Sequence, residues 1–349
     1  MTDVAIWGSY HYGNFGDDLM AEVFASAARQ FGARPSVISR NAHIVQSPEV
    51  QVAPTLDALT AEPDLIIIGG GAMLSSDRMI DFLARPASRA VDREFGELLR
   101  YCRTHSSRVV PLSIGGDGDG KSTGIWGNRR RFFDGPWARY GSVRLSTDAP
   151  LVERLFHKQY AYHPDVLFAA PRYVSNSQGD RSPNSGGARL GVNLHRKRAA
   201  PFVGALEKAF GAEVEIVPLV THSHVFGDPY EWTNDNDTVR YSTVTQFVEA
   251  LTELDGIVSD KLHVGLVSAT LGVPFVSYQP KPKTRGLHRE LGLSSAVADT
   301  PDEATSLVQS AILDQSSPTL RERISSEGLG ERAVAHIDLL RHALIHSGS

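Results

Sequence analysis

The sequence has little cysteine, no excess of basic residues and no long apolar segment. Cys102 is its only cysteine, so an internal disulfide is impossible, which agrees with a reducing cytoplasm. The formal net charge of −5 gives no reason to expect nucleic acid as a partner. No apolar run approaches the roughly 20 residues that cross a bilayer. The first residues lack the basic and apolar regions of a signal peptide, so we expect a cytoplasmic protein with at most peripheral membrane contact.

Length and composition indicate a globular protein with two domains. A chain of 349 residues is too long for one ordinary core. Its hydrophobic content of 41% and charged content of 21% are those of globular proteins. We therefore expect a first domain over residues 1–170, a linker over residues 171–188 and a second domain over residues 189–300. Residues 301–349 are expected to form C-terminal helices, the last of which can pack back on the first domain.

Short apolar runs alternate with helical patterns in both halves of the chain, which predicts an α/β fold with mostly parallel sheets. In the first half the predicted strands are residues 4–7, 36–39, 65–68, 109–114 and 143–145, and the predicted helices are residues 17–31, 91–104 and 149–156. In the second half the predicted strands are residues 189–193, 213–217, 256–259, 274–277 and 296–298, and the predicted helices are residues 201–210, 243–254 and 262–271. The expected architecture is two Rossmann-like domains that face a cleft.

The most informative segment is residues 256–274, which read as strand, polar turn, helix and strand. Its turn carries Asp260, Lys261 and His263. In open parallel sheets, ligands bind outside the carboxyl ends of the strands. The helix that starts near Lys261 also offers free N–H groups and a positive dipole end, which suit a phosphate or carboxylate. The segment therefore predicts an anion site, and a helix-capping histidine in the core is the alternative for His263.

Two glycine-rich loops follow predicted strands of the first domain. The first contains Gly13, Asn14, Gly16 and Asp17 and opens a helix that Asp17 or Asp18 can cap. The second contains Gly69, Gly70 and Gly71. Glycines there allow a ligand to approach the backbone, although tight turns explain them equally well. The first loop lacks the dinucleotide G-x-G-x-x-G spacing, and Arg40 rather than an acid follows the second strand, so NAD is not expected.

Other motifs have an alternative as strong as the functional interpretation. Residues 115–122 match the P-loop string, but Asp117 and Asp119 would repel phosphate, so we reject a nucleotide cradle. Arg144 follows a strand end and suits an anionic ligand, whereas a surface ion pair with Asp148 is the commoner outcome.

Three further polar clusters also have both a functional and a structural interpretation. His195 and Arg196 follow a strand and are either cleft residues or a solvated loop. The His222 and His224 pair lacks the partners of a zinc site, and Asp235 and Asp237 are more typical of a turn. We expect no metal.

Taken in order, the motifs resemble those of the polysaccharide pyruvyltransferases. The resemblance covers about residues 5–293 and rests on residues 13–18 (GNFGDD), 64–71 (DLIIIGGG), Arg144 with Asp148, 163–165 (HPD), 259–263 (SDKLH) and 272–274 (GVP). That family is similar in fold to the two-domain GT-B glycosyltransferases. The resemblance implies transfer of the pyruvyl group of phosphoenolpyruvate to hydroxyls of a sugar or glycan precursor, as a ketal, with release of phosphate.

The resemblance also implies roles for individual residues. His263 matches the family histidine at the phosphoenolpyruvate site and Leu262 its neighbour, while Arg144 matches an arginine that holds the donor. Lys281 or Lys283 falls near a basic residue of the family, and Lys261 stands where the family usually has arginine. Phosphoenolpyruvate would be the donor, with no cofactor, and a sugar or lipid-linked glycan the acceptor.

Two other functions remain open from the sequence. A GT-B glycosyltransferase would hold the diphosphate of a nucleotide sugar at the same basic turn. A non-catalytic sugar-binding member of the fold is the other alternative, because Lys261 replaces the usual arginine and loses its bidentate fork.

Overall fold

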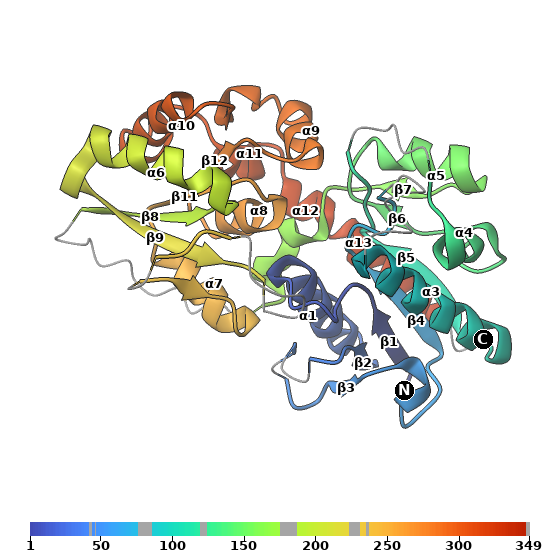
Figure 1. Cartoon of the computed structure of the whole chain (residues 1–349). Helices are drawn as coiled ribbons and strands as arrows, with labels where there is room; N and C mark the ends of the chain where they lie inside the picture. Colours follow the sequence, from blue (N-terminus) through green and yellow to red (C-terminus); the bar gives the residue numbers. More distant parts are fainter. Residues whose placement is uncertain are drawn as a thin grey trace. The chain divides into compact units, whose positions relative to one another are not determined.

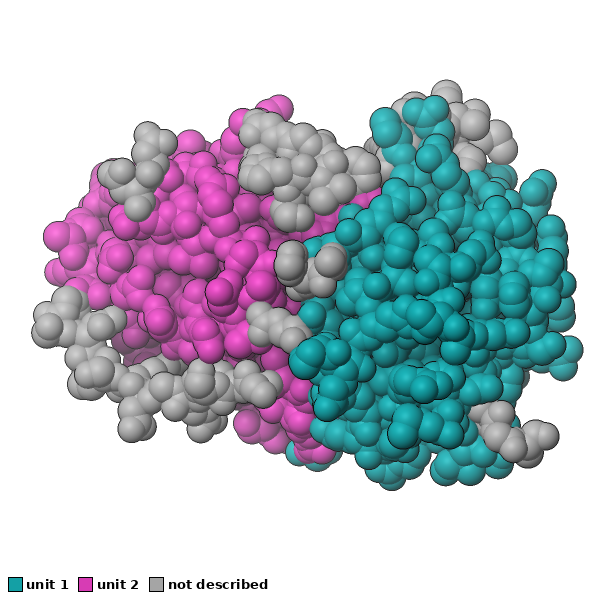
Figure 2. All heavy atoms as spheres, turned by 90° about the horizontal axis from the view of Figure 1, so that it is seen from below, with its two compact units in different colours: residues 1–11, 20–166, 331–349 teal, residues 12–19, 167–330 magenta. Residues whose placement is uncertain are grey.

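The computed structural model describes residues 1–41, 44–45, 47–75, 86–118, 124–174, 187–222, 231–234 and 237–346. The chain divides into two compact units, shown together in Figure 1 and in separate colours in Figure 2. Unit 1 comprises Met1–His11, Met20–Val166 and Glu331–Ser349, and unit 2 comprises Tyr12–Leu19 and Leu167–Gly330. Residues 12–19, predicted in the first domain, belong to unit 2. Of the predicted C-terminal helices, residues 301–330 belong to unit 2 and residues 331–349 to unit 1, the domain on which the last helix was expected to pack.

Unit 1 is built on a parallel sheet of five strands in the order β3-β2-β1-β4-β5. These strands are β1 (Asp3–Trp7), β2 (Arg34–Ile38), β3 (Gln51–Ala53), β4 (Leu65–Gly69) and β5 (Arg108–Leu112). All five residues of β4 are buried, as expected for a continuous apolar run at the centre of a parallel sheet. Outside this sheet, β6 (Ser142–Val143) pairs in parallel with β7 (Ala161–Tyr162).

The helices of unit 1 cover this sheet with apolar residues. They are α3 (Pro86–Thr104), α4 (Gly127–Asp134), α5 (Asp148–Phe156), α13 (Ala335–Ile345) and most of α1 (Phe15–Gln30). The short helices η1 (Leu56–Ala58) and α12 (Leu329–Ala333) complete the set for the described residues. In the core, Phe95 of α3 meets Trp7 edge to face, with ring centroids 4.9 Å apart. The last helix, α13, packs against β4 and β5.

Unit 2 has a parallel sheet of six strands in the order β10-β9-β8-β11-β12-β13. They are β8 (Ala188–Asn193), β9 (Val214–Val220), β10 (Val239–Arg240), β11 (Gly256–Ser259), β12 (Phe275–Tyr278) and β13 (Val297–Ala298). Register is fixed by pairs such as Ile257 with Phe275. The 10-9-8-11-12-13 order repeats the Rossmann order 3-2-1-4-5-6, and unit 1 has its first five strands.

The helices of unit 2 lie on both faces of its sheet, with α6 and α10 above the strands and α7 below them in Figure 1. They are α6 (Arg196–Phe210), α7 (Val244–Thr252), α8 (Leu262–Thr270), α9 (Pro282–Glu290), α10 (Pro301–Leu307) and α11 (Leu320–Ser326), with the shorter η2 (Val166–Arg172), η3 (Gly211–Glu213), η4 (Ser294–Ala296) and the π-helical η5 (Val308–Leu313). The α/β fold predicted from the alternating pattern is therefore confirmed.

Several details differ from the prediction for local reasons. The strand predicted over residues 109–114 ends at Leu112, because Ser113 has a left-handed backbone with φ of 54°. Helix α1 starts at Phe15, and the Asn14 side chain accepts the Gly16 N–H at 3.1 Å, so the predicted capping role of Asp17 or Asp18 is wrong. β3, β7, β10 and α9 were missed, because they are very short or rich in polar residues. Most of the predicted linker, residues 175–186, lies outside the described residues.

Candidate functional site

Four neighbouring strands of unit 2 end at one edge of the sheet in polar residues. β8 ends at Asn193, β9 is followed by Thr221 and His222, β11 ends at Ser259, and β12 leads to Lys281. Because the strands are parallel, all these ends lie on the edge where open α/β sheets bind ligands. Helices α8 and α9 start there, and neither has a side-chain cap. Their first N–H groups can therefore turn toward an anion.

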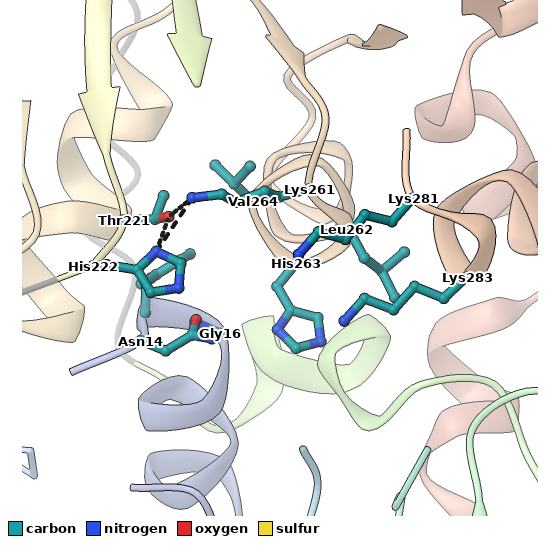
Figure 3. A pocket seen from close by; sticks show the side chains of 11 residues that line it. Asn14, Gly16, Thr221, His222, Lys261, Leu262, His263, Val264, Lys281 and Lys283 are labelled. Carbon is teal, nitrogen blue, oxygen red and sulfur yellow. Dashed lines mark hydrogen bonds between the residues drawn. The ribbon is translucent and has the colours of Figure 1, made fainter. Parts of the chain in front are cut away.

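A pocket opens at this edge with an empty volume of about 470 Å³, part of it in the open mouth. Five lining residues are lysines or histidines, and none of the lining residues that the structure describes is acidic. The pocket belongs entirely to unit 2 (Figure 3). Its lining consists of Asn14, Phe15, Gly16, Thr221, His222, Lys261, Leu262, His263, Val264, Lys281 and Lys283. This composition suits a compact, strongly negative group.

His263 is held at the pocket wall by the start of helix α1. It is buried in the first turn of α8, with 9% of its surface exposed. A Cβ atom placed on Gly16 would overlap the Cβ, Cγ and Nδ1 atoms of His263, so any larger residue would displace His263 or the start of α1. The sequence suggested that glycine at residue 16 admits a ligand, whereas in the structure it admits the imidazole of His263.

Lys261 makes its polar contacts within the protein. Its ammonium forms an ion pair with the buried carboxylate of Glu231. It also lies 3.3 Å from Thr221 Oγ1 and 3.2 Å from His222 Nδ1. Sequence analysis missed Glu231, since a single acid in a polar stretch carries no signal of burial.

Glu231 joins several strand ends at the site. Its Oε1 accepts hydrogen bonds from Asn193 Nδ2 at 2.7 Å and from the Thr221 hydroxyl at 2.6 Å, and its Oε2 accepts the His222 N–H at 3.2 Å. Burial alone would raise the pKa of Glu231, but its contacts with His222 and the charge of Lys261 hold it well below its ordinary value. Burial also lowers the pKa of Lys261, and Glu231 opposes this effect. Glu231 is therefore an ionised group that orders the site.

Some of the other predicted residues of unit 2 line the pocket and others lie outside it. Lys281, which is exposed, and Lys283 line the pocket, as does the buried Leu262. Gly13 and Asp17 belong to unit 2 but do not line the pocket. His195 caps α6, where its Nδ1 accepts the Lys197 N–H at 3.2 Å, and the exposed Arg196 begins that helix. Neither residue lines the pocket.

The predicted residues of unit 1 lie on a separate sheet. Gly69 ends β4, and Gly70 and Gly71 have left-handed backbones with φ of 61° and 74°. The Arg144 side chain is fully buried and pairs with Asp165 at 3.2 Å. The alternative expectation of a surface ion pair with Asp148 is wrong in its position, because both side chains are buried; Asp148 Oδ2 accepts the Gly116 N–H at 3.0 Å. The donor-binding role of Arg144 stays a prediction.

The metal and P-loop predictions fall partly outside the described residues. His224, Asp235 and residues 119–123 belong to those parts of the chain. Asp237 donates its N–H to Asn234 Oδ1 at 3.2 Å, which is turn chemistry. Within the residues that the structure describes, no group of histidine, cysteine and acidic side chains could hold a metal ion. Within the same residues, no helix is long and apolar enough to cross a membrane.

Comparison with known proteins identifies the fold. No family model and no curated protein matches the chain. Among solved structures, a UDP co-structure of S. aureus MnaA matches with a TM-score of 0.57 and 12% identity, over 99% of this chain and 98% of that one. Phytolacca americana UGT2 complexed with UDP-2fluoro-glucose and pterostilbene gives a TM-score of 0.55 and 11% identity over 100% of both chains.

A third solved structure, the glycotransferase of kitacinnamycin, gives a TM-score of 0.54 and 14% identity over 98% of this chain and 99% of that one. The chain has the GT-B fold. Because all three sequence identities are low, the similarity establishes the fold only. The reaction has to be inferred from the residues of the pocket.

Proposed function

We propose that this protein is a transferase that holds the phosphate of its donor in the pocket of unit 2. The observation that carries the proposal is the composition of this pocket. Five basic or imidazole side chains and the starts of α8 and α9 surround one opening, and no described lining residue is acidic. Fixed N–H groups and cations that face one point stabilise a phosphate and the negative charge that develops as it leaves.

The first candidate donor is phosphoenolpyruvate, which the ordered motifs and His263 support. A compact molecule with a phosphate and a carboxylate matches a cationic pocket of limited size. In this reaction the methylene carbon of the donor gains a proton while a sugar hydroxyl attacks C2. A second hydroxyl then displaces phosphate, which leaves a cyclic ketal. His263 would transfer these protons, since imidazole has an ordinary pKa near ~6.5.

The second candidate donor is a nucleotide sugar, and the comparisons favour it more than phosphoenolpyruvate. Two of the similar structures contain UDP or a UDP sugar, and one is a glycotransferase by name. The same cations would bind the diphosphate, and a sugar hydroxyl or another acceptor would take the glycosyl group. In both reactions the leaving group, phosphate in one and a nucleoside diphosphate in the other, would stay bound to the same cations.

Donor binding separates these candidates. Thermal unfolding is measured with phosphoenolpyruvate, UDP-glucose or GDP-mannose, and a ligand at ten times its dissociation constant stabilises the protein by about 1.4 kcal/mol. Lys283→Met, in the pocket, should reduce the stabilisation by the true donor. Lys208→Met, on the exposed face of α6, is the matched control and should leave it unchanged.

Turnover then completes the test. Phosphate release from phosphoenolpyruvate that depends on a sugar acceptor supports pyruvyl transfer, whereas acceptor-dependent release of UDP or GDP supports glycosyl transfer. If neither donor binds and no acceptor from a broad panel gives turnover, the transferase proposal fails and a non-catalytic sugar-binding protein becomes the better account.

A further inference from the structure

The pocket contains a second imidazole, His222, that the proposed chemistry does not use. His222 follows β9, and its side chain is 35% exposed. A backbone bridge joins His222 to Asn14, and the Phe15 N–H donates to Thr221 O at 3.0 Å. The start of α1 therefore fixes the backbone of His222. Figure 3 shows its ring between Lys261 and Asn14, with one nitrogen in contact with Lys261 and Thr221 and the other turned away from them.

The surroundings of Nδ1 decide which ring nitrogen carries the proton. Lys261 Nζ and Thr221 Oγ1 each lie 3.2 Å from His222 Nδ1, and Glu231 Oε2 lies at 3.4 Å. The Thr221 hydroxyl donates its proton to Glu231. An ammonium can only donate hydrogen bonds, and Lys261 Nζ lies nearer to Nδ1 than Glu231 Oε2 does, so we assign the contact at Nδ1 to a Lys261 N–H and not to an Nδ1–H that faces Glu231. Nδ1 is therefore the acceptor, and the single proton of the neutral ring is on Nε2.

The three N–H groups of Lys261 match the three acceptors around it. These are Glu231 Oε1, Thr221 Oγ1 and His222 Nδ1. An ammonium has three donors that point in different directions, whereas a guanidinium presents a planar fork. Lysine fits this position for that reason, and all its N–H groups are used inside the protein. These contacts favour a positioning role for Lys261, and the direct contact with the donor that the sequence predicted stays a prediction.

We propose that His222 is a second binding residue for the donor and that its Nε2–H donates to an anionic oxygen in the pocket. Lys261 keeps the proton on Nε2, and Glu231 holds Lys261 in place. The identity of the anion rests on the proposed function. His222 then has a different task from His263: it donates one hydrogen bond from Nε2, while His263 exchanges protons.

The position of the proton can be measured without any ligand. In protein labelled with ¹⁵N-histidine, the ring nitrogens of His222 are identified by their loss in His222→Gln. We expect an Nε2–H ring in the wild type and a change in its protonation pattern in Lys261→Met. An Nδ1–H ring, or a doubly protonated ring at neutral pH, would overturn the proposal.

The role in binding is measured by calorimetry with phosphoenolpyruvate, UDP and inorganic phosphate as probes. A hydrogen bond to a charged group predicts about tenfold to a hundredfold weaker binding by His222→Ala of whichever probe the wild type binds. His222→Gln places an amide N–H near the position of Nε2 and should recover most of this loss. His222→Asn places its amide nearer to Nδ1 and should recover less.

Two results would overturn the role in binding. Wild-type affinity in His222→Ala would show that the ring does not touch the ligand. Equal loss in His222→Ala and His222→Gln would show that an N–H donor at the position of Nε2 does not account for the binding. If the wild type binds none of the probes, the proposed function fails, and the ligand-binding role of His222 fails with it. The ring spectrum still decides separately whether Lys261 holds the proton on Nε2.

Discussion

The two units have closely similar parallel sheets but use their charged residues differently. In unit 2 the carboxyl edge of the sheet presents Lys281, Lys283, His222 and His263 to a pocket. In unit 1 the corresponding edge carries glycines at residues 69–71, and the nearby Arg144 is fully buried against Asp165. A Rossmann-like sheet therefore supplies the edge, and the side chains decide whether that edge binds a ligand or stabilises the protein.

The buried polar groups of unit 1 serve its internal structure. His336 of α13 is fully buried, with Nδ1 2.6 Å from the Ser142 hydroxyl and Nε2 2.9 Å from Pro164 O. His336 therefore joins the C-terminal helix α13 to strand β6 and to the segment that follows β7. The contrast makes a general prediction: changes at the edge of unit 2 should affect ligand binding and turnover, whereas changes at Arg144, Asp165 and His336 should affect stability.

The largest expected effect is that of His263→Ala. Loss of a group that transfers protons lowers turnover by about 10²–10⁴-fold. The measurement is release of phosphate or nucleotide under saturating donor and acceptor. Circular dichroism should show an intact fold, and His342→Ala, an exposed histidine of α13, is the control. Near-normal turnover by His263→Ala would place the chemistry elsewhere and remove the contrast between the units.

This site also shows how far sequence reasoning reaches. The β11 strand, the turn at Lys261 and the position of His263 were readable, because strand, turn and helix are contiguous and their periodicities are clear. The exact bounds of β11 were predicted. Lys283 was found only through the resemblance, since helix α9 is too polar to stand out.

Contacts between distant residues were not readable. Glu231 meets Lys261 across 30 residues, and His263 meets Gly16 across a much longer separation. The pairing of Arg144 with Asp165 depends on how β6 and the segment after β7 fold together. A sequence shows residue types and local periodicity. Which distant residues contact one another depends on tertiary packing, so these partners could not be predicted from the sequence.

The next largest effect is expected for Asp165→Asn in unit 1. Removal of the charge that faces the buried Arg144 should lower the free energy of unfolding by about 3–5 kcal/mol, because a buried cation then loses its ionic partner. Chemical denaturation measures this change. Asp57→Asn removes the partner of Arg100 in an exposed pair of the same unit and should cost at most about 1 kcal/mol. If Asp165→Asn instead abolished donor binding without loss of stability, Arg144 would belong to the donor site.

Acid should destabilise the protein through His336. Burial, followed by the nearby His163, lowers the pKa of His336 to about 3 from its ordinary value of 6.5. The folded state therefore keeps this ring neutral while the unfolded state gains a proton below pH 6.5, so stability falls as the pH falls. The expected loss is about 1.4 kcal/mol per pH unit, or about 2 kcal/mol at pH 5.

His336→Gln tests this dependence. The variant should be less stable at pH 7 but should lose stability less steeply between pH 6.5 and 4.5, as measured by denaturation at a series of pH values. His342→Gln is the control, since His342 is an exposed histidine of the same helix. An unchanged slope in His336→Gln would mean that other groups cause the acid sensitivity.

The smallest expected effect on stability is that of Gly16→Ala, which tests how the pocket of unit 2 is built. The added Cβ overlaps His263 at its Cβ and Cγ, so the ring or the start of α1 must move. The expected cost in stability is on the order of 1 kcal/mol, and donor affinity should fall with it, because the displaced ring lies in the pocket wall.

Gly204→Ala is the control. Gly204 lies in the exposed interior of α6 with open space around its Cβ, so alanine should stabilise the protein by about 0.4–1 kcal/mol and leave affinity unchanged. Calorimetric titration of both variants separates a local effect on His263 from a general effect of alanine. Wild-type affinity in Gly16→Ala would show that His263 does not depend on α1 for its position.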